Sequence, residues 1–216
     1  MKKAYICFTR VPLPGFTKTR LMPFLSADAC VKLQEAFLMD IARELEGLSC
    51  DVFIVHTPEE PGILKTIFPG ANFFPQTGQG LGERMNTALT RVLAKGYDAC
   101  ILTGSDLPDL TANHIEKAFH ALEVSDIVIS PSCDGGYSLI GMKVPCPELF
   151  EIGGYGGGSV YQKTLARAEI SGKTLTRMDG LNDVDTPQDL VALWQRTRDQ
   201  ESHTAAFLST VLGGSL

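Results

Sequence analysis

Three cations gather around a stiff, glycine-containing turn near the N-terminus. Arg10, Lys18 and Arg20 lie within eleven residues, and Gly15 follows two prolines between them. A phosphate-binding loop needs exposed main-chain amides and fixed positive charge, and this segment offers both. It is not a Walker A loop, because proline and threonine stand where that motif requires glycine. We predict that the loop binds nucleotide phosphates; a solvated basic loop is the alternative.

A second candidate is the run Gly-Gln-Gly-Leu-Gly-Glu-Arg at 78–84, which leads into a helical pattern. Glycines before a helix N-terminus leave main-chain amides free to bind an anion. The run is not a complete dinucleotide-binding motif, since Glu83 stands at the place of its third glycine. We predict that Gly80, Gly82 and Arg84 help to bind a nucleotide; a flexible connection is the alternative.

Carboxylates supply the third kind of chemistry. Asp106 follows an apolar strand-like run, where an acid is costly unless it is paired, hydrogen-bonded or bound to a metal. Asp183 and Asp185 precede Thr186, which is a predicted helix N-cap that explains neither acid. A second carboxylate meeting Asp106 would complete an oxygen-rich site suited to Mg²⁺ or Mn²⁺.

Asp134 opens the segment Asp-Gly-Gly-Tyr at 134–137, for which two interpretations stay open. Asp-Gly is a strong signal for a hairpin turn. The same acid could instead lie over the ligand-binding edge of a sheet, where the glycines permit close approach. Hydrolysis by a serine nucleophile has little support, because the sequence contains no Gly-x-Ser-x-Gly motif.

The elements that must position these residues follow from the hydrophobic pattern. Strands are predicted at 4–9, 51–56, 72–74, 100–103, 126–130, 137–142 and 174–178. Helices are predicted at 28–47, 60–67, 81–95, 112–123, 158–168 and 186–198. This alternation predicts an α/β fold with a mostly parallel sheet. In such a sheet ligands bind beyond the carboxyl ends of the strands, and the candidate residues follow strands.

Composition excludes several classes of protein. The chain has 216 residues, which favours one domain, and a net charge of −6, which argues against nucleic-acid binding through a global positive field. No apolar run is long enough to insert into a membrane. The six cysteines form no CxxC pair, which favours reduced thiols and a cytoplasmic location. Residues 200–216 predict a short helical tail, with its helix at 204–212, that could pack on a second copy in a homo-oligomer.

Five segments in order resemble the bacterial DUF2064 family of the nucleotide-diphospho-sugar transferase (glycosyltransferase A, GT-A) superfamily. They are Pro-Leu-Pro-Gly-Phe-Thr-Lys-Thr-Arg-Leu, Gly-Leu-Gly-Glu-Arg-Met, Gly-Ser-Asp-Leu-Pro-Asp-Leu, Asp-Gly-Gly-Tyr-Ser-Leu-Ile-Gly and Asp-Val-Asp-Thr-Pro-Gln-Asp-Leu. The resemblance implies a Rossmann-like GT-A fold, a three-layer α/β/α sandwich with a mostly parallel mixed sheet, over residues 1–199. It also implies a nucleotide on the first loop and a divalent ion on Asp106. Similarity of the last segment to CMP-KDO-type synthetases implies Asp185 as the second metal ligand.

The resemblance makes a metal-dependent glycosyltransferase the leading hypothesis: a sugar passes from a nucleotide-sugar to a small-molecule acceptor. Lys18 would neutralise the phosphates, and Asp134 would position or deprotonate the acceptor. The first alternative is a nucleotidyltransferase that joins an NTP to a phosphorylated small molecule and releases pyrophosphate. The second is a nucleotide-binding module without turnover.

Overall fold

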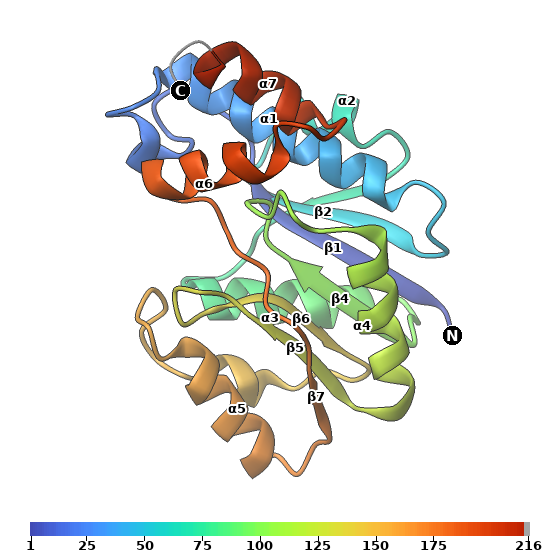
Figure 1. Ribbon diagram of the computed structural model, residues 1–216. Coiled ribbons are helices and arrows are strands. Elements are labelled where there is room, and N and C mark those ends of the chain that lie inside the picture. Colours follow the sequence, from blue (N-terminus) through green and yellow to red (C-terminus); the bar gives the residue numbers. More distant parts are fainter. Residues whose placement is uncertain (214–216) are drawn as a thin grey trace.

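Seven strands form one mixed sheet with helices on both faces (Figure 1). The computed structural model describes residues 1–213, so the last three residues of the predicted tail lie outside the described part. The strands are β1 (Lys3–Arg10), β2 (Asp51–Thr57), β3 (Asn72–Pro75), β4 (Ala99–Thr103), β5 (Ile127–Pro131), β6 (Tyr137–Met142) and β7 (Leu175–Arg177). Their order is β3-β2-β1-β4-β6-β5-β7. Only β6 runs antiparallel to its neighbours, which confirms the mostly parallel α/β sandwich.

The central strands are apolar on both faces, so each face supports its own core. Tyr5 and Cys7 of β1 pack with α1 (Ala27–Leu45), α2 (Leu64–Ile67) and α4 (Ala112–Val124). Ala4 and Ile6 point to the other face and pack with α3 (Leu81–Leu93) and α5 (Val160–Ile170). Burial of one such isoleucine side chain contributes about 1.5–3 kcal/mol to stability. The two cores therefore hold the strand ends in a fixed arrangement.

A third apolar cluster supports the region around the first loop. It joins one end of α1 to the short 3₁₀ helix η1 (Thr19–Leu21), α6 (Pro187–Thr197) and α7 (His203–Leu212). The carboxylate of buried Asp40 accepts hydrogen bonds from the main-chain N–H groups of His203 (2.8 Å) and Thr204 (2.9 Å) at the start of α7. The predicted tail helix is thus present, and it packs on α1 of its own chain (Figure 1).

Capping residues set the ends of two helices, and the cap at Thr186 is the one predicted above. Ser26 caps α1, and Thr186 caps α6 through a capping box with Asp189. The helix predicted at 60–67 is shorter and begins only at Leu64. Gly62 has a φ of 51°, which is incompatible with a right-handed helix. The 3₁₀ helices η1 and η2 (Pro147–Phe150) were not predicted. Among the described residues, no helix has the length and apolar character needed to cross a membrane.

Candidate functional site

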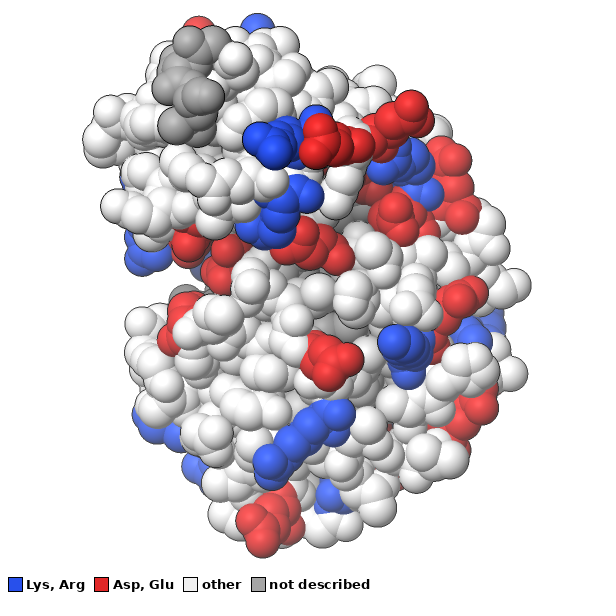
Figure 2. Space-filling view, viewed as in Figure 1, with Lys and Arg blue, Asp and Glu red and all other residues white. Residues whose placement is uncertain are grey.

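A cleft of about 1110 Å³ opens at the carboxyl ends of the parallel strands. It brings most of the predicted site residues together: Arg10, Lys18, Arg20, Gly80, Arg84, Asp106, Asp134 and Asp185. Gly15 and Gly82 are not among the residues that line it. In the space-filling view the surface is notched, and acidic side chains lie on both edges of the notch (Figure 2).

Lys18 lies at the junction of three segments. Its Nζ donates to Asp106 Oδ1 (2.9 Å) and to the Val184 carbonyl oxygen (3.0 Å), and it lies 4.7 Å from the centre of the Phe37 ring. Only 3% of the side chain is exposed. Lys18 is also the one non-glycine residue between 1 and 213 with a positive φ, 46°. Such strain persists only where surrounding contacts enforce it, so Lys18 is a fixed cation.

Asp106 connects the end of β4 to the segment before α6. Its main-chain oxygen accepts a hydrogen bond from the Val184 N–H (3.2 Å). One carboxylate oxygen accepts from Lys18, yet 42% of the side chain remains exposed. Asp106 can therefore bind a ligand while it stays paired with Lys18.

Arg20 and Asp185 form a looser pair beside this junction. Arg20 Nη1 lies 3.1 Å from Asp185 Oδ2, and the two side chains are 75% and 42% exposed. A pair exposed to this degree contributes at most about 1 kcal/mol. Both groups can therefore exchange their partner for a ligand at little cost.

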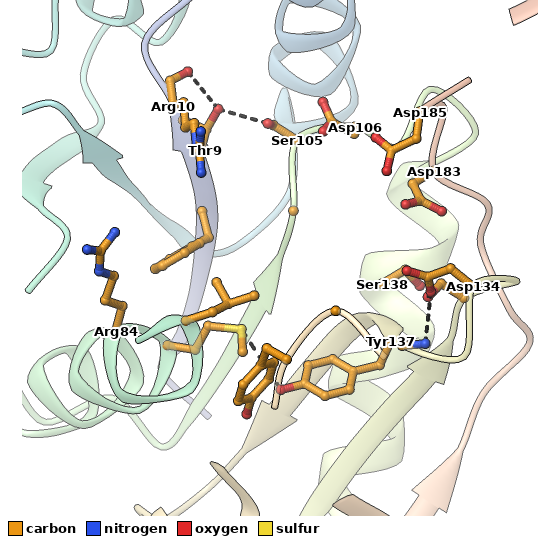
Figure 3. Close-up of a pocket in the computed structure, with 18 of the residues that line it drawn as sticks. Thr9, Arg10, Arg84, Ser105, Asp106, Asp134, Tyr137, Ser138, Asp183 and Asp185 are labelled. Carbon is orange, nitrogen blue, oxygen red and sulfur yellow. Dashed lines mark hydrogen bonds between the residues drawn. The ribbon is translucent and has the colours of Figure 1, made fainter. Parts of the chain in front are cut away.

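The carboxylates of the cleft repel one another (Figure 3). Burial raises the pKa of Asp183, and the charges of Asp185, Asp134 and Asp106 raise it further. Burial and Asp106 also raise the pKa of Asp185, against the opposing effect of Lys18 and Arg20. Raised acid pKa values mark a place where added positive charge would be favourable.

The acids of the cleft fit a divalent ion that takes some of its ligands from the protein and the others from a substrate. Within residues 1–213, no three His, Cys, Asp or Glu side chains are arranged to hold a metal by themselves. Mg²⁺ commonly binds one or two carboxylates and completes its shell with water and substrate phosphates. Asp106 and Asp185 fit that pattern, with the phosphates of a bound nucleotide as the missing ligands.

The glycine-rich run before α3 is held by its own side chains. Arg84 Nε donates to the Gly78 carbonyl oxygen (2.8 Å), and Glu83 accepts from the Gln79 N–H (2.8 Å). Gly80 is the N-cap and provides no side-chain cap, which leaves the first amides of α3 free for an anion. Gly82 also has a packing role: a Cβ there would lie 2.4 Å from Tyr155 Cε2.

Asp134 satisfies both interpretations of its segment. It lies in the hairpin that joins antiparallel β5 and β6, and it also lines the cleft. Asp134 Oδ1 accepts hydrogen bonds from the Gly136 N–H (2.8 Å) and from the Ser132 hydroxyl. Since these bonds fix its direction, Asp134 presents a carboxylate to the cleft.

A group of hydrogen-bonded polar residues in the lining of the cleft was not predicted from the sequence. Thr9 Oγ1 donates to Ser105 Oγ (2.8 Å), which also accepts from Gln34 Nε2 (3.1 Å). Gln76 Nε2 donates to the Thr9 carbonyl oxygen (2.8 Å). Gln34 is buried in the apolar stripe of α1. A polar residue in such a stripe is the feature of the sequence that could have predicted these hydrogen bonds. This group ties the ends of β1 and β4 to α1 and to the segment after β3.

Known proteins with similar sequences are guanylyltransferases. A 2-phospho-L-lactate guanylyltransferase of Methanocaldococcus sp. (strain FS406-22) is 31% identical over 176 residues, which cover 80% of this chain and 74% of the relative. A phosphoenolpyruvate guanylyltransferase of Sphaerobacter thermophilus is 29% identical over 181 residues, which cover 82% of this chain and 86% of the relative.

A solved structure and a family model agree with the fold. The crystal structure of a candidate nucleotide-diphospho-sugar transferase from Desulfovibrio desulfuricans G20 superimposes with a TM-score of 0.91 at 33% identity, over 97% of this chain and 95% of the other. The family model described as an uncharacterized protein conserved in bacteria (DUF2064) matches residues 30–156. The chain therefore belongs to the DUF2064 family, and it is an enzyme of the transferase class with a Rossmann-like nucleotide-sugar transferase fold.

Proposed function

We propose that the protein is a nucleotidyltransferase that joins an NTP to a phosphorylated small molecule and releases pyrophosphate. The observation that carries this proposal is the meeting of Lys18 with Asp106 and the Asp183–Asp185 segment in one cleft. A triphosphate requires cations and acids that can bind its metal ion, and the meeting of these side chains supports both roles. The guanylyltransferase relatives favour this reaction over sugar transfer, and they favour GTP as the donor.

The reaction exchanges one phosphorus–oxygen bond for another. A phosphate oxygen of the acceptor forms a bond to the α-phosphorus of the NTP. The bond from the α-phosphorus to its bridging oxygen breaks, and pyrophosphate leaves with the electron pair. Negative charge accumulates on the leaving group, so fixed donors directed at it lower the barrier.

The residues of the cleft divide these tasks. Lys18, Arg20 and Arg10 neutralise the triphosphate, and the free amides that follow Gly80 bind another part of the nucleotide. Asp106 and Asp185 would hold Mg²⁺ or Mn²⁺, which would supply further positive charge to the phosphates. Because Lys18 is already fixed by two hydrogen bonds, it needs no reorganisation when the charge develops.

Transfer of a sugar from a nucleotide-diphospho-sugar is the second candidate, favoured by the description of the D. desulfuricans structure. The two reactions release different products from the same cleft. Nucleotidyl transfer converts an NTP to pyrophosphate, whereas sugar transfer converts a nucleotide-diphospho-sugar to a nucleoside diphosphate.

The test measures both products in one panel. The protein is incubated with Mg²⁺, one of four NTPs or a UDP- or GDP-sugar, and either phosphoenolpyruvate or sn-glycerol 3-phosphate. We expect pyrophosphate from an NTP, with GTP the best donor, and no nucleoside diphosphate from the sugars. Nucleoside diphosphate release without pyrophosphate would reject the proposal.

A further inference from the structure

Charge divides the cleft into two halves (Figure 3). The basic half holds Arg10 and Arg84, and Lys18 and Arg20 lie at its border, where they pair with Asp106 and Asp185. The acidic half consists of the lining residues from Leu102 onwards; these include four aspartates and, among the described residues, no lysine or arginine. An NTP needs the cations, so the acidic half is left for the acceptor.

Two aspartates remain in the acidic half after the proposed metal ligands are set aside. Asp134 and Asp183 line the cleft, and neither forms an ion pair with another residue between 1 and 213. Asp183 is half-buried, and two hydrogen bonds fix Asp134. The acceptor therefore meets two carboxylates whose charge no protein cation balances.

The main-chain amides nearest to Asp134 do not compensate for this charge. The N-terminus of α5 would ordinarily attract an anion, but its first amides are already used. The N–H groups of Ser159 and Val160 bond to the Gly157 carbonyl oxygen, and that of Tyr161 bonds to the Gly135 carbonyl oxygen (2.9 Å). The Gly136 N–H is likewise taken by Asp134. A carboxylate on the acceptor would therefore be repelled by Asp134 and Asp183 and would find none of these amides free.

We propose that the acceptor is a phosphate ester whose remaining part presents hydrogen-bond donors, hydroxyl or ammonium groups, and no carboxylate, to Asp134 and Asp183. This inference rests on the proposed function and narrows its acceptor. The acceptor phosphate lies at the border of the two halves, near Lys18, and the donor groups extend toward Tyr137 and Tyr155. The acceptor class thus differs from the phospho-carboxylates in the names of the relatives.

Two matched pairs of compounds test the charge directly. 3-Phosphoglycerate and sn-glycerol 3-phosphate differ by a carboxylate in place of a hydroxymethyl group. Phosphoserine and phosphoethanolamine differ by one carboxylate, and they carry an ammonium group. Binding of each compound is measured by calorimetry on the protein with Mg²⁺ and a non-hydrolysable GTP analogue, and pyrophosphate release with GTP is measured in parallel.

We expect the carboxylate-free member of each pair to bind more tightly, by about tenfold for each unfavourable charge contact removed. The stronger of the two carboxylate-free compounds distinguishes a hydroxyl-bearing from an ammonium-bearing acceptor. Equal binding within the pairs, preference for the carboxylates, or binding by none of the four compounds would overturn the inference.

A double variant tests whether Asp134 and Asp183 cause the preference for carboxylate-free compounds. Asp134→Asn/Asp183→Asn should reduce the preference within each pair, whereas Asp109→Asn, which removes a carboxylate outside the cleft, should leave it unchanged. A preference that survives in the double variant would overturn the assignment to these acids. Failure of the proposed function looks different: pyrophosphate is absent with every NTP, while the binding comparison still decides the acceptor class.

Discussion

The two halves of the cleft are built by different kinds of contact. On the basic side, contacts from other segments fix the charged group: Lys18 is held by Asp106 and the Val184 carbonyl oxygen, above the buried Phe37 ring. In the acidic half, main chain packs on main chain, and a Cβ on Gly135 would lie 2.3 Å from the Gly158 oxygen. Under the proposed function, we expect that loss of the basic side stops the reaction and that alteration of the acidic side changes acceptor selectivity.

Loss of the fixed cation should produce the largest effect. Lys18→Met keeps the apolar stem but removes the charge, and we expect kcat/KM for GTP to fall by about 10²–10³-fold. Arg20→Met, at an exposed position in the same loop, should cost less than about tenfold. Steady-state pyrophosphate release measures both. Turnover of Lys18→Met within a few-fold of the parent would mean that Lys18 has only a structural role.

The acids at the border of the halves come next. Asp106→Asn should weaken Mg²⁺ binding to the GTP-loaded protein by about 10–100-fold, measured by calorimetric titration. Asp109→Asn is the control, because Asp109 pairs with Arg196 at 2.7 Å outside the cleft. Unchanged Mg²⁺ affinity in Asp106→Asn would refute the proposed metal site.

Packing between α3 and the glycine loop provides a third comparison. In Gly82→Ala the new Cβ would lie 2.8 Å from the Phe150 carbonyl oxygen as well as against Tyr155. We expect a loss of about 1–3 kcal/mol in the free energy of unfolding, measured with urea. Gly80→Ala meets nothing within 4 Å and should cost less than about 1 kcal/mol, the preference for Gly over Ala at an N-cap. Equal stability of the two variants would contradict the close contact.

The smallest effect concerns stability against pH. The pKa of Asp183 is raised above its ordinary 3.8, so the folded state binds this proton more tightly than the unfolded state. Stability from Asp183 is therefore present at low pH and is lost as pH rises through the raised pKa. Asp183→Asn should melt about 2 °C above the parent at neutral pH, a gain that disappears toward pH 3. A lower Tm at neutral pH would contradict the repulsion among the acids.

The hydrophobic pattern of short segments predicted the sheet and the edge where the site lies. Strand and helix periodicity and capping residues can each be recognised within a few neighbouring residues of the sequence. The Asp134 hairpin and the Thr186 cap were predictable for this reason. The contact from Lys18 to Val184 spans 166 positions and depends on packing around α6 and α7, which no local pattern reports.

The structural roles of the glycines were the hardest to predict from the sequence. The run at 78–84 predicted that Gly82 helps to bind a nucleotide, and the structure shows a further constraint on that glycine, the ring of Tyr155. Gly15, with a φ of 82°, shapes the turn of the first loop without lining the cleft. A glycine that permits close approach and one that permits a turn look alike in a sequence, since both roles require only a missing side chain.

One measurement tests nucleotidyl transfer most directly. The protein receives equal amounts of GTP and a GDP-sugar with Mg²⁺ and sn-glycerol 3-phosphate, and ³¹P NMR records which donor is consumed. We expect loss of the GTP signals, a pyrophosphate signal and a new diphosphate linkage on the acceptor, while the GDP-sugar stays intact. Consumption of the GDP-sugar with release of GDP, and unchanged GTP, would contradict it.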